Sequence, residues 1–421
     1  MHPQTLLLDA FRTALAAADA RQILPPHLPA PPAGRSLVVG GGKAAASMAV
    51  AVEDHWPASA PLSGLVVTRY GHGLPTRLIE VVEASHPLPD GRGQGAAQHM
   101  LDLAVQLGPD DLLLCLLSGG GSSLLAAPVA GVSLKNLRAA TRTLLASGAP
   151  IQDINTLRKH LTRFSGGQVA AATRAKVCAL ILSDVVGDDP ADIASGPCAP
   201  DPGSYRDALD VLKRYGVAAP AAVLHHLEEG AAGRVPDTPK PGDALFRRVD
   251  NRIIGSARLS LTAAAHHLRS RGIGVSNLGE AEDDAAHLAR AHAQLLREHL
   301  AHGGPRPYAW LSGGESTVQV NNAKGRGGRN SAYLLALGLQ LAGAQGVWAL
   351  ACDSDGIDGS EDNAGALLSP ETLHKIGENP ADASALLAEN RAYDFFRDCN
   401  ALVITGPTRT NVNDLRLLLL A

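Results

Sequence analysis

Short apolar runs alternate with longer amphipathic segments along this chain, which is the pattern of strands alternating with helices. In the helical segments, such as residues 5–20, leucines and alanines recur three and four positions apart. The strands expected in the first half are Leu37–Val39, Leu62–Thr68, Leu78–Ala84, Asp111–Leu117 and Lys176–Leu182. Because Asp111–Leu117 is almost uniformly apolar, we expect that strand to be buried on both faces.

A second series of alternating elements follows Gly230–Asp243, a stretch rich in proline and glycine that has no apolar period. The strands expected there are Arg252–Ile254, Gly274–Leu278, Tyr308–Leu311, Val347–Ala351, Leu402–Thr405 and Leu415–Leu420, with Ser316–Val320 as an antiparallel strand. The pattern predicts an α/β protein of two domains, each a largely parallel sheet flanked by helices. We place the domains at residues 1–235 and 244–421, and allow the helix at residues 5–20 to pack on the second domain.

Composition narrows the class of protein. The 421 residues are 45% hydrophobic and 19% charged, which is enough apolar material for a substantial core. The net charge of −4 and the lack of a basic block argue against nucleic-acid or membrane-surface partners. The five cysteines form no C-x-x-C pair, and the N-terminus has no basic region of a signal peptide. A cytoplasmic enzyme is the simplest setting.

Four of the expected strands close on turns of one kind: VGGGK, LSGGGS, LSGGES and ITGPT. The carboxyl ends of parallel strands share one edge of a sheet, and ligands bind at that edge. Two such turns fall in each half of the chain. They predict a polyanion held in an interdomain cleft.

The first turn ends in three glycines and a lysine, and a helical segment follows. The candidate ligand-binding residues there are Gly41, Gly42 and Lys43. A glycine turn, a helix start and a compact positive charge together suit a phosphate. The turn also fits G-x-G-x-x-A through Gly40, Gly42 and Ala45, and with Arg69 after the next strand an NADP site stays open. The structural alternative is a tight turn with Lys43 in solvent.

The second turn follows the most apolar strand of the first half. Its glycines and serines can donate N–H and O–H groups to phosphate oxygens. The candidate residues are Ser118, Gly119, Gly120, Gly121, Ser122 and Ser123. The alternative is an ordinary turn between a strand and a helix.

Carboxylates cluster after two other strands. Asp184 and Asp189, in SDVVGDD, follow a buried strand and suit either Mg²⁺, which takes few protein carboxylates, or a base for a hydroxyl proton. Asp353, in CDSDGIDG, could face a metal or a ribose, and a network of Asx turns explains that cluster equally well.

Arg326 and Arg329 flank a Gly-Gly turn in GRGGRN just before a helix. A guanidinium can bind phosphate or carboxylate through two parallel hydrogen bonds, whereas the alternative is a solvated arginine pair. His72 and His86 lie on loops rich in glycine and proline, and we assign neither a role. The chain has no H-E-x-x-H or G-x-S-x-G motif.

Together these motifs resemble the class II glycerate 2-kinases, whose C-terminal module is known as the MOFRL domain. The matching segments are VVGGGKAA, SHPLPDGRG, LLSGGGSSL, INTLRKHLTRFSGGQ, ILSDVVGDDPADIASGP, LSGGESTV, GRGGRN, DSDGIDG and ITGPTRTNVNDL. They span nearly the whole chain in the order of the family. The chain departs from the usual pattern at Ser331–Ala332, Val186 and Arg409, and the charged positions are intact.

The resemblance implies phosphorylation of the C2 hydroxyl of D-glycerate by ATP with Mg²⁺, between two α/β domains. The key lysine and arginine of the family correspond to Lys43 and Arg329. We expect both to neutralise charge on the transferred phosphoryl. Asp184 or Asp189 would hold Mg²⁺ or accept the proton, and the remaining candidates for phosphate or substrate are Gly313, Gly314, Glu315, Thr317, Arg326, Asn330 and Asp353.

Two rival functions remain. Some members of the family carry the label hydroxypyruvate reductase, and the G-x-G-x-x-A match supports an NADP-dependent enzyme of that kind. The other rival is a non-catalytic sensor of a phosphorylated sugar acid. For the kinase we expect D-glycerate and ATP as small-molecule partners, no nucleic acid or membrane, and a homodimer as one assembly state.

Overall fold

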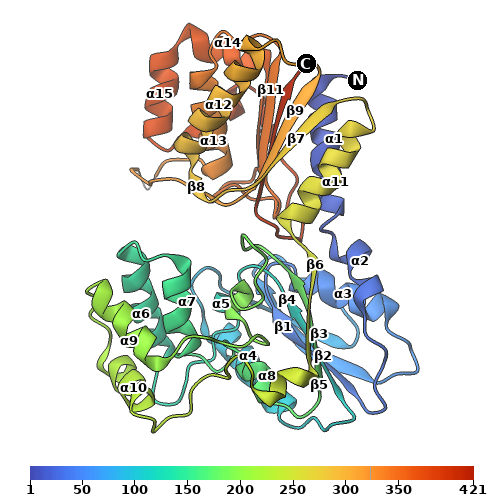
Figure 1. Ribbon diagram of the computed structural model, residues 1–421, viewed down its shortest axis with the longest axis vertical. Coiled ribbons are helices and arrows are strands. Elements are labelled where there is room, and N and C mark those ends of the chain that lie inside the picture. Colours follow the sequence, from blue (N-terminus) through green and yellow to red (C-terminus); the bar gives the residue numbers. More distant parts are fainter. Residues whose placement is uncertain (323) are drawn as a thin grey trace. The chain divides into compact units, whose positions relative to one another are not determined.

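The computed structural model describes residues 1–322 and 324–421, which form two compact units (Figure 1). The N-terminal unit is Ala20–Ile254, and the C-terminal unit combines Met1–Asp19 with Gly255–Ala421. The predicted boundary at Gly230–Asp243 therefore differs from the boundary in the structure. No helix in the described residues is long and apolar enough to cross a membrane.

The N-terminal unit is built on a six-stranded sheet of order β3-β2-β1-β4-β5-β6. Its strands are β1 (Ser36–Gly41), β2 (Leu62–Arg69), β3 (Ile79–Ala84), β4 (Leu112–Leu117), β5 (Lys176–Leu182) and β6 (Val249–Gly255). Its helices are α2 (Ala20–Ile23), α3 (Ala45–His55), α4 (Gly91–Ala104), α5 (Gly121–Leu124), α6 (Leu134–Ala146), α7 (Ile151–Lys159), α8 (Gln168–Ala171), α9 (Tyr205–Arg214) and α10 (Ala221–Ala231). The neighbours from β3 to β5 all pair in parallel, as predicted.

Helices cover both faces of this sheet because alternate residues of each strand point to opposite faces. In β1, Val38 packs with Met48 of α3, whereas Leu37 and Val39 pack with Met100 of α4. A third apolar cluster joins α6, α7, α9 and α10, which gather beside the sheet in Figure 1. The uniformly apolar β4 is buried along its whole length, which confirms the prediction for residues 111–117.

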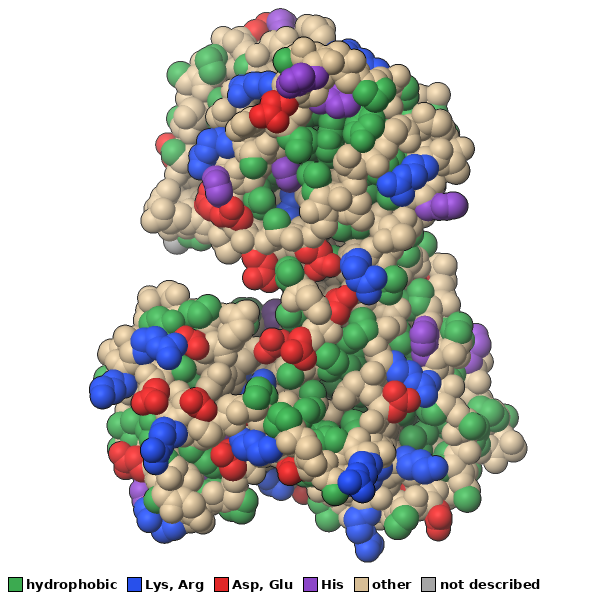
Figure 2. Space-filling view, in the orientation of Figure 1, with side chains coloured by type: hydrophobic (Ala, Val, Ile, Leu, Met, Phe, Trp, Pro, Cys, Tyr) green, Lys and Arg blue, Asp and Glu red, His purple; other side chains and the backbone are tan. Residues whose placement is uncertain are grey.

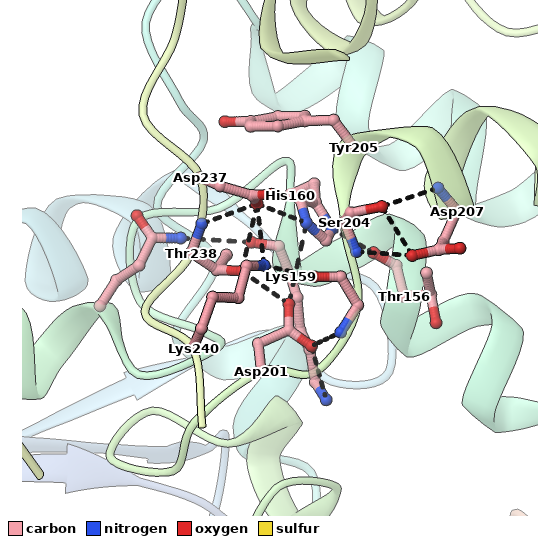
Figure 3. A network of polar contacts seen from close by, with 12 residues as sticks. Thr156, Lys159, His160, Asp201, Ser204, Tyr205, Asp207, Asp237, Thr238 and Lys240 are labelled. Atoms are coloured by element: carbon pink, nitrogen blue, oxygen red, sulfur yellow. Dashed lines mark hydrogen bonds and ion pairs between the residues drawn. The ribbon is translucent and has the colours of Figure 1, made fainter. Parts of the chain in front are cut away.

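The Pro- and Gly-rich segment near residue 235 belongs to the N-terminal unit because side chains fix it there (Figure 3). Thr238 Oγ1 donates a hydrogen bond to Asp201 Oδ2 at 2.9 Å, and His160 Nε2 lies 3.0 Å from Asp237 Oδ1. Lys240 Nζ donates to Thr238 Oγ1 at 2.8 Å. The chain then adds β6 to the first sheet before it enters the C-terminal unit.

The C-terminal unit is built on a second six-stranded sheet, of order β13-β12-β11-β14-β9-β7. Its strands are β7 (Gly274–Glu280), β9 (Tyr308–Gly314), β11 (Val347–Asp353), β12 (Gly365–Leu368), β13 (Leu402–Val403) and β14 (Asp414–Leu420), with a small pair formed by β8 (Asp283–Asp284) and β10 (Ser316–Thr317). Its helices are α1 (Pro3–Ala16), α11 (Ala257–Arg269), α12 (Ala285–Ala301), α13 (Arg329–Gln340), α14 (Pro370–Glu378), α15 (Pro380–Ala388) and α16 (Ala392–Asp398).

This second sheet is mixed, which corrects the expectation of a largely parallel one. The last strand, β14, lies between β9 and β11 and runs antiparallel to both. β12 is likewise antiparallel to its neighbours β11 and β13, so β7 and β9 form the parallel pair. Even so, β9 and β11 share one direction, and their carboxyl ends meet at one edge of the sheet.

The helix α1 packs in the C-terminal unit, where Leu7, Phe11 and Ala14 join the same apolar cluster as Leu261 of α11. The other face of the sheet is covered by helices α12 to α16. The predicted antiparallel strand at residues 316–320 is wrong, because β10 ends at Thr317 and pairs in parallel with β8.

A carboxylate inside the N-terminal unit gives a test of the packing. Glu53 of α3 accepts hydrogen bonds from the backbone N–H groups of Arg77, Leu78 and Ile79 at 2.6–3.0 Å, and so holds the start of β3. Burial raises the pKa of Glu53, but these hydrogen bonds outweigh it and the net pKa is lowered. Glu53→Gln should lower the free energy of unfolding by about 1–3 kcal/mol.

The lowered pKa fixes the sign of the pH dependence. The Glu53 contribution is present above the ordinary pKa of a glutamate, and it is lost as the pH falls through the lower pKa of the folded state. Urea unfolding from pH 7 to pH 3 should therefore show the wild type and Glu53→Gln converging in acid. Glu80→Gln, on the exposed surface of β3, is the control and should change little at any pH. A constant difference across this range would contradict the assignment.

Candidate active site

Two of the predicted glycine turns lie side by side at one edge of the N-terminal sheet. β1 ends at Gly41 and β4 ends at Leu117, and these two residues are paired partners in the parallel register. From β1 the chain adds β2 and β3 on one side, and it then returns to add β4, β5 and β6 on the other side. The strand order therefore reverses between β1 and β4. In open α/β sheets ligands bind at such a switch point, outside the carboxyl ends of the strands.

Hydrogen bonds join the two turns directly. The N–H of Lys43 donates to Gly119 O at 2.8 Å, and the N–H of Ser118 donates to Gly41 O at 3.2 Å. Gly42 has a φ of +141°, and a Cβ added there would lie 2.1 Å from Ser118 Oγ. A glycine is therefore required at position 42 for the close approach of the two turns, whatever ligand they bind.

Lys43 stands between β1 and the buried helix α3, and its side chain is half-buried. The N–H of Ala44 already donates to Ser118 Oγ at 3.1 Å, and the N–H of Ala45 to Gly42 O at 3.1 Å. These two backbone donors of the helix start are thus used inside the fold. The ammonium group of Lys43 is what this turn chiefly brings to an anion.

The serines of the second turn belong to a chain of polar contacts that sequence reasoning missed. Ser122 Oγ lies 2.7 Å from Ser195 Oγ, which donates to Asn155 Oδ1 at 3.1 Å. Ser195 has a φ of +60°, a backbone conformation that costs free energy in a residue with a side chain. The one signal available was that Asn155 and Ser195 lie within two of the family-like segments, INTLRKH and DIASGP.

His86, which sequence reasoning left without a role, also lies at this turn. A Cβ added to Gly120 would lie 2.8 Å from His86 Nε2, so the imidazole lies against the glycine backbone. The side chain reaches the turn from the loop between β3 and α4.

The two predicted aspartates differ in their surroundings. Asp184 is half-buried and lies just beyond β5, whose Ile181 pairs with Leu117 of β4, so it is at the same sheet edge as the turns. Asp189 is exposed, and its Oδ1 accepts the N–H of Ala191 at 2.8 Å. No cluster of three or more His, Cys, Asp or Glu side chains suited to a metal occurs in the described residues.

In the C-terminal unit Arg329 is surrounded by three carboxylates. Its Nε donates to Asp414 Oδ1 at 2.8 Å, its Nη1 to Glu315 Oε1 at 2.6 Å and its Nη2 to Asp353 Oδ2 at 2.8 Å. Burial lowers the pKa of this guanidinium, but the charges of the three carboxylates outweigh it and raise the pKa above its ordinary value. Arg329 therefore holds these three side chains together. Its predicted task, to neutralise a phosphoryl group, stays a prediction.

The three carboxylates meet because their strands end at one edge. β9 ends at Gly314, one residue before Glu315, and β11 ends at Asp353. β14 begins at this edge, where Asp414 is the register partner of both Gly314 and Asp353. The predicted Gly313 and Gly314 thus form the end of β9, and a hollow of about 470 Å³ beside Arg329 is lined by Glu315, Thr317 and Gly328, among others.

Asp414 and Arg416 are fully buried charged residues that sequence reasoning left out of the site. Asp414 Oδ2 accepts from Arg416 Nη1 at 3.4 Å, and Arg416 Nε donates to Ser312 Oγ at 3.2 Å. The available signal was an Asp and an Arg two positions apart in the otherwise apolar run DLRLLLL. Three carboxylates and two guanidinium groups give this cluster one net negative charge.

The remaining predicted residues of this unit have structural partners. Asn330 Nδ2 donates to Asp414 Oδ1 at 2.7 Å, and the backbone N–H of Asn330 donates to Asp358 Oδ1 at 2.9 Å. Asp358 thereby caps the start of α13, and burial raises its pKa. The N–H of Asp355 donates to Asp353 Oδ1 at 2.9 Å. This bond forms an Asx turn, which is the structural alternative considered for Asp353.

Within the described residues, Arg326 makes no contact with the cluster around Arg329. Its Nη2 lies 2.7 Å from Glu361 Oε2, and its guanidinium lies 4.3 Å from the centre of the Tyr393 ring. Through these contacts Arg326 supports the glycine turn that precedes α13.

Known proteins match both halves of the chain. The MOFRL family matches residues 308–414, and a domain of unknown function, DUF4147, matches residues 6–228. A D-glycerate 2-kinase of Thermotoga maritima is 38% identical over 389 residues, which cover 90% of this chain and 89% of that protein. A protein of Agrobacterium vitis, provisionally named a hydroxypyruvate reductase, is 44% identical over 420 residues, covering 99% and 94%.

A solved structure of the glycerate kinase of Thermotoga maritima superimposes with a TM-score of 0.87 at 34% identity, covering 99% of each chain. With the strand order and the glycine turns, this likeness defines an enzyme of the glycerate kinase class. The chain belongs to the MOFRL-domain family of glycerate 2-kinases.

Proposed function

We propose that this protein is an ATP-dependent kinase that phosphorylates the C2 hydroxyl of D-glycerate, giving 2-phospho-D-glycerate and ADP. The observation that carries the proposal is the meeting of the VGGGK and LSGGGS turns at the switch point of the N-terminal sheet, with Lys43 in the first turn. This geometry brings a cation and two serine hydroxyls to one sheet edge, in a chain whose relatives include a D-glycerate 2-kinase.

In the reaction the C2 oxygen bonds to the γ-phosphorus of ATP, the bond to the β–γ bridging oxygen breaks, and ADP leaves. We assign Lys43 to the negative charge that spreads over the transferred group. The hydroxyl proton passes to a carboxylate, for which Asp184 is the stronger candidate because Asp189 is exposed and bonded to Ala191. The hydroxyls of Ser122 and Ser123, which now bond to Ser195 Oγ and Gly120 O, would turn to donate to oxygens of the bound substrates.

The residues present fit a magnesium ion that takes most of its ligands from phosphates and water. Asp184, with Asp189 as the second choice, would supply a protein oxygen in the N-terminal unit. Mg²⁺ would shield the phosphate oxygens as the leaving group develops charge.

Product analysis tests the proposal. Incubation with D-glycerate and MgATP should give a new ³¹P resonance of a secondary phosphate ester, coupled to the single proton on C2. A product with the phosphate on C3, or ATP loss that does not depend on glycerate, would contradict the proposal.

The second candidate function is an NADPH-dependent hydroxypyruvate reductase. The strand order of the N-terminal sheet, which is that of dinucleotide-binding folds, and the name of the Agrobacterium vitis relative favour it. It predicts steady loss of NADPH absorbance with hydroxypyruvate in the absence of ATP. The kinase predicts no such loss.

Several expectations about partners and setting belong to this proposal as well. On the face in Figure 2, basic and acidic side chains are mixed over each unit. The absence of a nucleic-acid partner stays a prediction. A cytoplasmic location, a cleft between the domains and a homodimer as one assembly state stay predictions.

A further inference from the structure

A small cavity of the N-terminal unit gathers positive charge next to the second glycine turn. Its volume is about 80 Å³, and its lining includes three arginines, Arg138, Arg142 and Arg158, with Ser122 and Ser123. The other lining residues are apolar or neutral, so no Asp or Glu of the described chain balances the arginines in this cavity.

Helix geometry explains why the three arginines converge. Arg138 and Arg142 are four positions apart and lie on one face of α6. Arg158 comes from the last turn of α7, next to Lys159 and His160, whose side chains are fixed by the network in Figure 3. Lys159 Nζ lies 3.6 Å from Asp201 Oδ1, so the end of α7 is held in place from its other side. The backbone of the last turn of α7, which carries Arg158, is therefore held in place.

The guanidinium groups have few partners inside the protein. Arg158 Nη1 donates to the neutral Asn155 Oδ1 at 3.2 Å, and no ion pair to Arg158 occurs in the described part of the chain. Arg138 Nε is buried and makes no hydrogen bond within the same residues. Burial lowers the pKa of Arg158 to about 10. Arg158 and Arg138 are half-buried and have no carboxylate partner in the described residues, so an anion would stabilise this arrangement.

The size of the cavity limits the anion. Pockets for nucleotides and other large ligands have volumes of about 300–1,000 Å³, so the cavity can take a carboxylate or a small acid but not a nucleotide. It is also connected to the proposed active site, because Ser122 contacts Ser195 and through it Asn155, which accepts from Arg158. On the other side of the same turn, Gly119 O accepts the N–H of Lys43.

We propose that this cavity, with Arg158 and Arg138 as its main cations, binds the carboxylate of the hydroxy acid that is phosphorylated. The inference rests on the proposed kinase function and adds the residues that select an acid over a neutral polyol. A guanidinium fork binds a carboxylate through two parallel hydrogen bonds.

Steady-state kinetics with Arg158→Gln and Arg142→Gln test the inference, with Arg206→Gln on the exposed face of α9 as the matched control. We expect Arg158→Gln to raise the KM for D-glycerate about 10- to 100-fold, because a charge-assisted hydrogen bond is lost, and to leave the KM for ATP within about 2-fold. Arg142 lies on the exposed side of α6. Arg142→Gln should therefore raise the KM for D-glycerate by a smaller factor and should not affect folding. Arg206→Gln should match the wild type.

The amide of D-glyceric acid distinguishes recognition of the carboxylate from a general loss of structure. The wild type should prefer the acid strongly over the amide, and Arg158→Gln should lose most of this preference. An unchanged KM for D-glycerate in Arg158→Gln, or a rise in the KM for ATP alone, would overturn the inference.

Calorimetric titration of the nucleotide-free protein with D-glycerate separates this inference from the proposed function. Failure of the wild type to phosphorylate D-glycerate would refute the kinase. Even then, binding of D-glycerate that is at least 10-fold weaker in Arg158→Gln than in Arg206→Gln would support the cavity as the acid site, and equal binding in the two variants would overturn it.

Discussion

Replacement of Lys43 by methionine should lower kcat about 100- to 1,000-fold. It removes the positive charge that stabilises the transferred phosphoryl group as this group gains negative charge in the transition state. Methionine is close to lysine in length and has no charge, so the turn between β1 and α3 should keep its shape. The backbone bond from Lys43 N–H to Gly119 O is unaffected by the change. We therefore expect the loss in kcat without a matching loss in the free energy of unfolding.

Initial rates at saturating D-glycerate and MgATP measure the effect, and Lys213→Met on the exposed face of α9 serves as the matched control. Both variants should unfold in urea at the midpoint of the wild type. Turnover of Lys43→Met within about 3-fold of Lys213→Met would remove Lys43 from the mechanism. It would return the VGGGK turn to the structural alternative, a tight turn with Lys43 in solvent.

The N-terminal sheet was largely predictable because its central strands β1, β4 and β5 are buried on both faces. Strands of this kind are short uniform apolar runs, and Asp111–Leu117 and Lys176–Leu182 are clear examples. Parallel pairing then follows from the helices between the strands, and it places the turns after β1 and β4 at one edge. The sequence alone could not show that Ser122 contacts Ser195, because these residues are far apart in the chain.

The C-terminal sheet was harder to predict because its order depends on the last strand. The run DLRLLLL predicts a strand, but its insertion between β9 and β11 depends on long-range pairing that local periodicity does not encode. Sequence reasoning also assigned nothing to the region that holds β12 and the helices α14 to α16. Two of these helices begin with proline and span only nine residues each, so their apolar period is short.

The difference at the domain boundary has a similar cause. A segment rich in proline and glycine is typical of a linker, and nothing local shows that Asp237 and Thr238 bond to His160 and Asp201. The same limit applies to Arg329. Its position after a glycine turn suggested a cation that faces a phosphate, whereas the three carboxylates come from β11, β14 and the residue after β9.

Because it contacts those carboxylates, Arg329 should contribute strongly to the stability of the C-terminal unit. Arg329→Met would leave Asp353 and the fully buried Asp414 without the guanidinium that both now contact. Removal of one partner from a buried ion pair costs about 3–5 kcal/mol, because the remaining charge stays buried without a counter-charge. Arg416 still contacts Asp414, so we expect a value near the lower end of this range.

Hydrogen exchange followed by mass spectrometry measures this loss in each unit separately. Amides of β14 and β11 should exchange about 100-fold faster in Arg329→Met, and amides of β1 and β4 in the same molecule should be unchanged. Glu315→Gln is the matched control, because the Glu315 side chain is 50% exposed and its pairing with Arg329 is therefore worth little.

A double-mutant cycle shows whether the effect comes from the stranded charge. Neutralising Asp353 in the Arg329→Met background, as Asp353→Asn, should restore part of the lost protection, since the two side chains form one network. If β14 and β11 keep their wild-type exchange rates in Arg329→Met, the cluster does not depend on its guanidinium. A drop in kcat in such a variant would then assign Arg329 to the chemistry rather than to the fold.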